Sequence, residues 1–190
     1  MEGDEKMSEE ISLSKKIKKA ALLLFFQHHR LPGAKGWELR KVLGKDYMKI
    51  IKLLNRRLDE LGLEVKIVHE GPSEEQSEDF DRARFYIVSK SPMIEELSGW
   101  RIDTLAVLAA SIAYITSKQG KATRQEVEEF LREKFPDWKI EQDLNIFIRR
   151  GYLSEDEVNN LYIGWRTRAE IDIKTLLEII AGYVPSELKI

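Results

Sequence analysis

The order of the predicted elements constrains this 190-residue chain most, because three helices followed by a β-hairpin are predicted twice in succession. In the first half, apolar periodicity and stop signals predict helices at about 12–28, 36–43 and 46–61. Gly44 and Gly62 end the second and the third of these helices. Two alternating, β-rich segments follow at 64–69 and 84–89, separated by a polar stretch at 70–82. This is the element order of a winged-helix domain.

The same order is predicted again in the second half of the chain. Helices are expected at about 103–118, 123–134 and 140–150, and the second of them begins at Thr123 with the spacing of a capping box. A short hairpin at 152–153 and 160–163 and a last helix at about 173–182 follow. The predicted fold is therefore mainly α with small β-hairpins (α+β), arranged as tandem winged-helix domains.

The expected organisation has four parts. A disordered tail at 1–11 precedes a first winged-helix domain at 12–90, whose hairpin loop at 70–82 is acidic. A connector at 91–102 leads to a second winged-helix domain at 103–190, which ends in a C-terminal helix. In both halves a helix runs into a glycine, Gly62 or Gly151, and then into a strand. Because such junctions also arise by chance, the duplication rests mainly on the element order.

Composition and motifs argue against an enzyme. The chain has no cysteine, which excludes disulfides, thiolate catalysis and cysteine-ligated metal sites. It has no glycine-rich phosphate loop, no His-Glu-x-x-His segment and no nucleophile elbow. The adjacent His28 and His29 diverge by about 100° on a helix, so they do not make a shared ligand pair. We expect no catalytic residues, no cofactor and no metal.

The apolar runs and the composition of the chain indicate where in the cell the protein is expected. The runs at 20–26 and 105–115 are too short to span a bilayer, so no membrane association is expected. The absence of cysteine fits a reducing, intracellular setting. The expected location is the cytoplasm, associated with the nucleoid, or the nucleus in a eukaryote. The abundance of Lys, Glu and Arg would suit an archaeal or thermophilic protein.

The third predicted helix carries one apolar and one basic stripe. Its apolar face contains Tyr47, Ile50, Ile51, Leu54, Leu58 and Leu61. The opposite face carries the candidate DNA-binding residues Lys45, Lys49, Lys52 and Arg56. The third helix of a winged-helix domain enters the major groove, so these side chains could neutralise phosphates without reading bases. The alternative is an ordinary solvated helix face. The acidic loop at 70–82 would repel phosphates if it pointed at the duplex.

The first helix of the second half is apolar on nearly all sides. Such a helix is either buried on all sides or meets a partner, and both interpretations stay open. The candidate partner-binding residues are Leu105, Leu108, Ile112 and Ile115. The helix at 140–150 has mostly acidic and amide side chains on its exposed face, so it is poorly suited to DNA. The four tryptophans are isolated and are expected to anchor the cores.

A segment near the C-terminal end carries a family resemblance. Gly164, Arg166 and Glu170 follow the pattern Gly-x-Arg-x-x-x-Glu, where a wing ends and a helix begins. This pattern resembles the second winged helix of the kite family, the kleisin-interacting tandem winged-helix subunits of SMC complexes, nearest to its MAGE and non-SMC-element branch. MAGE proteins usually have Trp before the Gly and Pro after it, where this chain has Ile163 and Trp165. The apolar run at 105–114 is also similar to bacterial segregation and condensation protein B.

The resemblance implies a non-enzymatic subunit that dimerises with itself or with a sister kite. It also implies a kleisin-like partner and an SMC ATPase complex. The resemblance and the basic stripe together indicate an accessory subunit of an SMC-type complex for chromosome organisation, segregation or repair. This subunit is expected to bind a kleisin-like protein, and DNA without sequence preference. The alternative is a stand-alone tandem winged-helix transcription regulator that binds DNA.

Overall fold

The structure is a computed structural model, and it describes residues 2–26, 31–69, 79–91 and 99–182. The chain divides into two compact units, Met1–Met93 and Ile94–Ile190, and each unit has its own hydrophobic core. Both combine helices with a small antiparallel sheet, so the fold belongs to the α+β class and is mainly helical. The described residues contain no helix of the length and apolar character that crossing a membrane requires.

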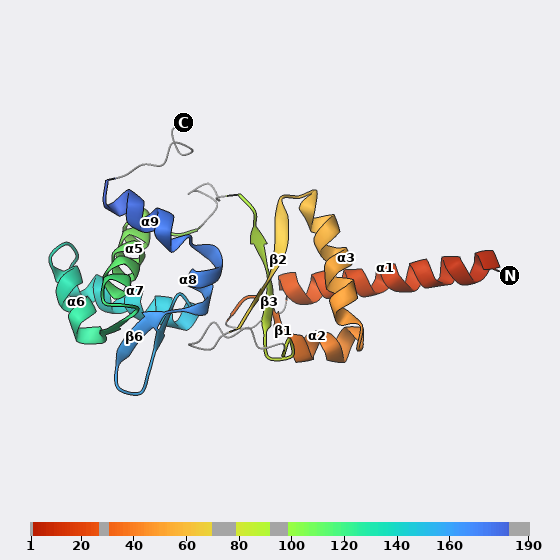
Figure 1. The fold of residues 1–190 in the computed structure, drawn as a ribbon, viewed down its shortest axis with the longest axis horizontal. Coiled ribbons are helices and arrows are strands. Elements are labelled where there is room, and N and C mark those ends of the chain that lie inside the picture. Colours follow the sequence, from red (N-terminus) through yellow and green to blue (C-terminus); the bar gives the residue numbers. More distant parts are fainter. Residues whose placement is uncertain (1, 27–30, 70–78, 92–98, 183–190) are drawn as a thin grey trace. The chain divides into compact units, whose positions relative to one another are not determined.

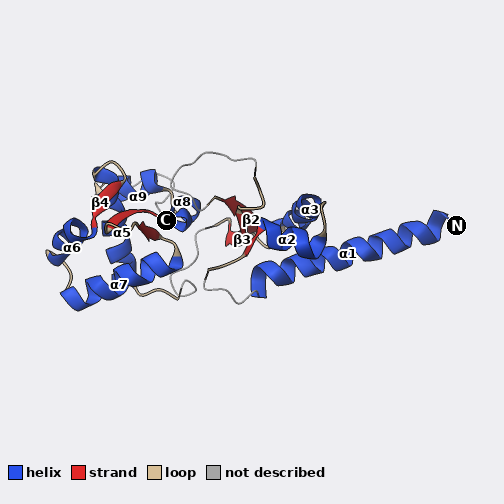
Figure 2. Ribbon diagram, turned by 90° about the horizontal axis from the view of Figure 1, so that it is seen from below, coloured by secondary structure: helices blue, strands red, loops and turns tan. Residues whose placement is uncertain are grey.

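The described part of the first unit contains three helices and a three-stranded antiparallel sheet, coloured red to yellow-green in Figure 1. The elements are α1 (Glu2–Phe26), β1 (Ala34–Lys35), α2 (Gly36–Leu43), α3 (Tyr47–Asp59), β2 (Leu63–Val68) and β3 (Arg84–Ser89). The strand order is β1-β3-β2, with Ala34 opposite Phe85 and Val65 opposite Ile87. The helices gather on one side of this sheet (Figure 2).

The core of the first unit follows from the spacing of its apolar residues. Ile17, Ala20 and Leu24 recur at helical spacing on one face of α1 and are at most 5% exposed. This face packs against α3, because α1 and α3 lie in contact. The sheet adds Phe85, whose ring meets Tyr47 edge to face at a centroid distance of 5.9 Å. The other buried members are Ala34, Leu39, Leu43, Ile50, Ile51, Leu54, Leu58 and Ala83.

The second unit has a closely related order of elements. They are α5 (Ile102–Ser117), β4 (Lys121–Thr123), α6 (Arg124–Arg132), α7 (Asp137–Arg150), β5 (Leu153–Glu155), β6 (Asn160–Ile163), α8 (Trp165–Glu170) and α9 (Ile173–Ile180). The strand order is β4-β6-β5, so a short strand between the first two helices again pairs with the last strand of the hairpin. Its core collects apolar side chains from α5, α6, α7 and the sheet.

Two local features of the second unit agree with the sequence. The Thr123 capping box is confirmed: the Glu126 backbone N–H donates to Thr123 Oγ1 at 3.2 Å, and the Thr123 N–H donates to Glu126 Oε2 at 2.8 Å. Gly151 ends α7 with a φ of 83°, a left-handed conformation that favours glycine. The capping box therefore fixes the start of α6, and Gly151 fixes the end of α7.

Some elements differ from the sequence prediction. Helix α1 begins at Glu2, whereas the sequence predicted a disordered tail at 1–11. Helix α3 ends at Asp59, and Leu61 is therefore 71% exposed rather than part of the apolar face. The strands β1 and β4 were not predicted, because strands of two or three residues carry no readable alternation.

Candidate interaction surfaces

The basic stripe of the first unit lies on the exposed side of α3. Lys49, Lys52 and Arg56 are exposed on the helix, and Lys45 is exposed just before the helix begins at Tyr47. The opposite face of α3 is buried in the core, so its packing holds the stripe outward. The stripe therefore offers four cationic side chains, three on α3 and one just before it.

Among the described residues, the ion pair within this stripe is an exposed one. It joins Lys49 Nζ to Asp46 Oδ1 at 3.1 Å, with side chains 78% and 76% exposed. Such an exposed pair contributes at most about 1 kcal/mol and leaves the lysine accessible. On the flank of α3 that meets the sheet, Asn55 Oδ1 accepts the Val65 backbone N–H at 2.8 Å. This bond ties α3 to β2 and keeps the orientation of the basic stripe fixed.

The predicted partner-binding residues of α5 lie mostly inside the core. Leu108 is 4% exposed, and Ile112 and Ile115 are fully buried. The reason is the packing of α5, which contacts α6, α7, α9 and the strands β4 and β6. These three side chains are core residues, which corrects the prediction that they contact a partner and agrees with the core alternative that the sequence left open. Leu105 is half-buried.

The resemblance motif forms a tight junction between α7, β5 and α8. The Gly164 N–H donates to the Tyr152 carbonyl at 2.8 Å, and the Arg166 N–H donates to the Gly151 carbonyl at 3.0 Å. A Cβ at Gly164 would lie 2.2 Å from the Gly151 carbonyl oxygen, so only glycine fits this approach. Thr167 Oγ1 also donates to the Tyr152 carbonyl, at 2.6 Å. The segment between α7 and β5 is thus bonded directly to the start of α8.

The side chains of the motif reinforce this junction. Arg166 Nε lies 2.5 Å from Glu170 Oε1, one helical turn away. The Tyr152 hydroxyl donates to Glu170 Oε2 at 2.8 Å, and the Arg166 guanidinium lies 4.6 Å from the centroid of the Tyr152 ring. Burial raises the pKa of Tyr152 well above its usual value, so this hydroxyl stays protonated and remains a donor. Gly164, Arg166 and Glu170 therefore act here as a structural clasp.

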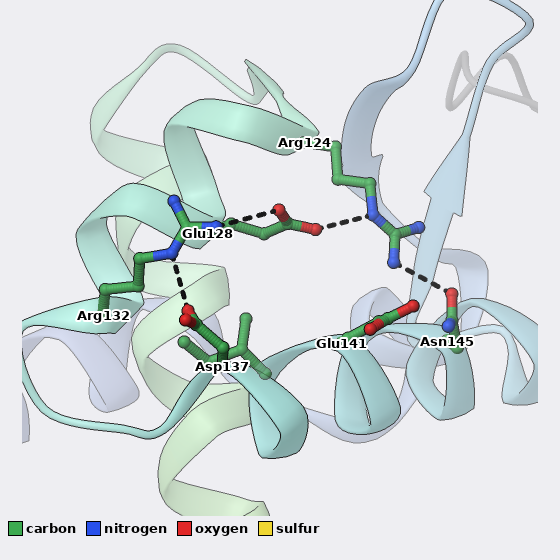
Figure 3. Close-up of a pocket in the computed structure, with 7 residues that line it drawn as sticks. Arg124, Glu128, Arg132, Asp137, Glu141 and Asn145 are labelled. Atoms are coloured by element: carbon green, nitrogen blue, oxygen red, sulfur yellow. Dashed lines mark hydrogen bonds and ion pairs between the residues drawn. The ribbon is translucent and has the colours of Figure 1, made fainter.

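A charged groove lies between α6 and α7 in the second unit (Figure 3). Glu128 bridges two cations: its Oε1 is 2.9 Å from Arg124 Nε, and its Oε2 is 3.8 Å from Arg132. Arg132 Nε also lies 2.7 Å from Asp137 Oδ1, and Arg124 donates to Asn145 Oδ1 at 2.9 Å. The groove has a volume of about 470 Å³. Its arginines already have protein partners, and the Arg132–Asp137 ion pair and the Arg124–Asn145 hydrogen bond join α6 to α7.

A second groove in this unit combines aromatic, apolar and charged side chains. It has a volume of about 370 Å³ and lies between the segment that enters α5 and one face of α7. The α7 face presents Trp138, Gln142, Ile146 and Arg150 at four-residue spacing, which places them along one side of the helix. The other wall includes Trp100, which lies at the opposite end of α7 from Trp138. We call this the tryptophan groove.

The base of the tryptophan groove contains a buried ion cluster. Lys139 Nζ lies 3.0 Å from Asp143 Oδ2 and 3.2 Å from Asp103 Oδ2, and it donates to Thr104 Oγ1 at 3.2 Å. Burial acts to lower the pKa of Lys139, but the bonds to Asp143 and Asp103 outweigh it, so the pKa lies above its ordinary value. Lys139 therefore stays charged and joins α7 to the start of α5. The cluster therefore links the two parts of the chain that line the groove.

The sequence interpretation missed this groove. It treated all four tryptophans as core anchors, which describes Trp165, 7% exposed, but not Trp138 or Trp37, which are 68% and 53% exposed. One wall of the groove could have been predicted from the sequence, because Trp138, Gln142, Ile146 and Arg150 recur every four residues and so share one side of a helix. The other wall could not be predicted from residue spacing, because it comes from the segment before α5, which reaches α7 only through tertiary contacts. No group of acidic or histidine side chains among the described residues could hold a metal ion.

Comparison with known proteins gives a similarity of fold. No family model matches the chain, and no curated protein matches it. Among solved structures, the chain is similar to a chain of the "Nse1-Nse3-Nse4 complex", with a TM-score of 0.60 and 16% sequence identity. The match covers 94% of this chain and 92% of the other chain. At this sequence identity, the similarity shows a shared fold.

Proposed function

We propose that this chain is a non-enzymatic accessory subunit of an SMC-type chromosome complex, built from two consecutive winged-helix domains. The observation that carries the proposal is the structural similarity to a chain of a multi-subunit complex, over 94% of this chain. The shared element order of the two units supports the tandem arrangement. Each runs from a helix through a short strand and two helices to a hairpin, and both sheets place the last hairpin strand in the centre.

The proposed partners are a kleisin-like protein, an SMC ATPase complex and DNA. The neighbour belongs to a complex whose name contains three components, which supports assembly with other subunits. A homodimer, or a heterodimer with a sister subunit, fits the same class. The proposed location is chromatin or the nucleoid. Co-purification of a tagged chain from its native cells tests this function: recovery of a kleisin and an SMC ATPase supports it, and recovery of neither contradicts it.

The first unit is the proposed DNA-binding part. One side of α3 exposes Lys49, Lys52 and Arg56, and Lys45 is exposed just before the helix. Within the described residues, the ion pair given for this stripe is the exposed Lys49–Asp46 pair. Contacts to phosphates position a protein on DNA and carry no sequence information, so the binding would lack base preference. The second unit has acidic groups on the exposed part of α7, including Glu141, which disfavours a phosphate contact there. We therefore assign DNA binding to the first unit and not to α7 of the second unit.

A charge-reversal variant tests the DNA face. Replacing Lys49, Lys52 and Arg56 by Glu should weaken duplex binding and reduce the slope of log affinity against log salt by about 0.9 for each lost phosphate contact. A control with the same change of charge replaces three exposed lysines of the second unit, Lys118, Lys121 and Lys134, by Glu. Equal salt slopes for the two variants would contradict the DNA face.

The alternative function is a stand-alone tandem winged-helix transcription regulator. The basic stripe alone would suit it, because recognition helices of regulators also enter the major groove. The two functions differ in what accompanies the chain on DNA. A regulator would be recovered as a homodimer bound to one promoter sequence, without an SMC ATPase.

A further inference from the structure

We propose that Trp37 and Phe80 of the first unit form a stacking site for the unpaired bases of single-stranded DNA, whose phosphates contact Lys41 and Lys45. The proposal extends the proposed DNA face, on which it rests for the duplex beside the unpaired strand. Trp37 lies in the first turn of α2 and is 53% exposed, and Phe80 lies in the segment before β3 and is 40% exposed. Neither ring belongs to the core of the first unit.

Backbone contacts hold the two aromatic residues at one place in the fold. The Trp37 N–H donates to the Asp81 carbonyl at 3.0 Å. The Gly36 N–H donates to the Ala83 carbonyl at 2.9 Å. The approach of the two segments is close, since a Cβ at Gly36 would lie 1.9 Å from the Phe80 carbonyl oxygen. A tertiary contact therefore gathers two exposed rings that lie far apart in the sequence.

Cations continue from Trp37 toward the basic stripe. Lys41 follows Trp37 by about one helical turn, and side chains at this spacing are neighbours, with Cβ atoms about 5–6 Å apart. Lys45 lies between α2 and α3 and is also the first residue of the stripe. Both lysines are exposed. Because α2 leads directly into the start of α3 (Figure 1), these lysines connect the stripe to the aromatic pair.

The two carboxylates next to Phe80 in the sequence already have cationic partners. Asp81 Oδ2 lies 2.7 Å from Arg40, and Asp79 Oδ2 lies 3.5 Å from Arg82 Nε. Within the described residues, by contrast, no ion pair engages Lys41 or Lys45. These two lysines therefore offer their charge to an anion such as a phosphate.

An exposed aromatic pair beside cations fits unpaired bases and not a base-paired duplex. In a duplex the faces of each base are covered by its stacked neighbours, so an aromatic side chain stacks only on a base that has left the stack. Such stacking tolerates any base, because every base has a π-face. Phosphate contact through the stripe and stacking at Trp37 are therefore separate activities of the first unit.

Binding of the full chain to three labelled DNAs tests the proposal: a blunt duplex, the same duplex with a single-stranded thymidine tail, and oligo-dT. The wild type should bind the tailed duplex more tightly than the blunt one. Trp37→Ala should weaken binding of the tailed duplex and of oligo-dT by about fivefold or more, because one stacking ring is lost. It should leave binding of the blunt duplex unchanged. Trp37→Phe, which keeps a ring, should retain most of the binding.

A control and a spectroscopic signal separate stacking from a general loss of binding. Trp138→Ala removes an indole of the second unit that is 68% exposed, and it should leave binding of all three DNAs unchanged. Oligo-dT should quench part of the tryptophan fluorescence of the wild type, because a stacked base quenches an indole, and this quenching should be lost in Trp37→Phe. Since Trp37 is more than half exposed, the thermal melts of its variants should match the wild type.

Three results would overturn the proposal. The tail adds no affinity, or Trp37→Ala and Trp138→Ala have the same effect on the tailed duplex. In the third, Trp37→Ala releases a co-purified protein from the chain and leaves binding of all three DNAs unchanged, because the aromatic pair would then be a protein contact.

The stacking site and the proposed DNA face fail in different ways. If Trp37→Ala has no effect while replacement of Lys49, Lys52 and Arg56 by Glu weakens binding of the blunt duplex, the stacking site is wrong and the DNA face stands. If the tail adds affinity that depends on Trp37 while the charge reversal leaves duplex binding unchanged, the DNA face is wrong and the stacking site stands.

Discussion

Replacement of Ile112 by Ala separates the core interpretation of α5 from the partner interpretation. Ile112 is fully buried. The change removes three carbon atoms from the core, which costs about 2.4 kcal/mol of transfer free energy at about 0.8 kcal/mol per carbon. The cavity left behind adds to this loss, and the range for such buried changes is about 2–5 kcal/mol. We expect the free energy of unfolding of the second unit to fall by about 3 kcal/mol.

The assay uses the tryptophans as reporters. In a Trp37→Phe background the remaining tryptophans all lie in the second unit, so urea unfolding followed by fluorescence reports that unit alone. Ile102→Ala is the matched control, because it makes the same change on the same helix at a side chain that is 66% exposed. The control should change the stability by less than about 0.5 kcal/mol. The core interpretation is refuted if Ile112→Ala unfolds at the wild-type urea concentration and instead loses partner binding.

Three further changes test the local contacts of the second unit. Gly164→Ala would place a Cβ 2.2 Å from the Gly151 carbonyl, and should destabilise the unit by about 1–3 kcal/mol or more in the same urea assay; an unchanged midpoint would show that the clasp can open. The pKa of Asp156 is held at about 2, first by the side-chain and backbone bonds from Asn160 and also by the Tyr162 hydroxyl. Because this folded-state pKa lies below the ordinary value of 3.8, the stabilisation is present above about pH 4 and is lost as the pH falls toward 2. Asp156→Asn should therefore be less stable than the wild type at pH 6, and the difference should shrink at pH 2; a constant difference would contradict the cause given. Thr123→Ala should cost about 1 kcal/mol and speed hydrogen exchange in the first turn of α6, whereas unchanged exchange would mean that the cap contributes nothing.

The sequence predicted the longer elements well, because each repeats an apolar pattern over six residues or more. Helix α2 lies at Gly36–Leu43, as predicted, and β3 lies at Arg84–Ser89, as predicted. The buried face of α3 also follows its periodicity, apart from Leu61, which lies beyond the end of the helix. Stop signals set the ends of α7 and α2, since Gly151 and Gly44 both follow directly. Local signals were sufficient where one helix or strand defined the feature.

Features that depend on tertiary contacts were beyond the reach of periodicity. The strands β1 and β4 are too short for a pattern and exist because they pair with β3 and β6. The helix α5 is apolar all round, which the sequence read as either core or interface, and only its packing partners decide between them. The groove at Trp138 needs Trp100 from a distant segment. The positions of the motif residues were found, but their function as a clasp follows from backbone bonds to Gly151 and Tyr152.

Chromatin immunoprecipitation of the tagged chain, with and without depletion of the SMC ATPase, tests the central claim most directly. An accessory subunit of an SMC-type complex should lose most of its chromosomal occupancy when the ATPase is depleted, because the phosphate contacts of one basic stripe are non-specific and weak at physiological salt. Occupancy that persists at discrete promoters after depletion would contradict the account and identify a stand-alone regulator.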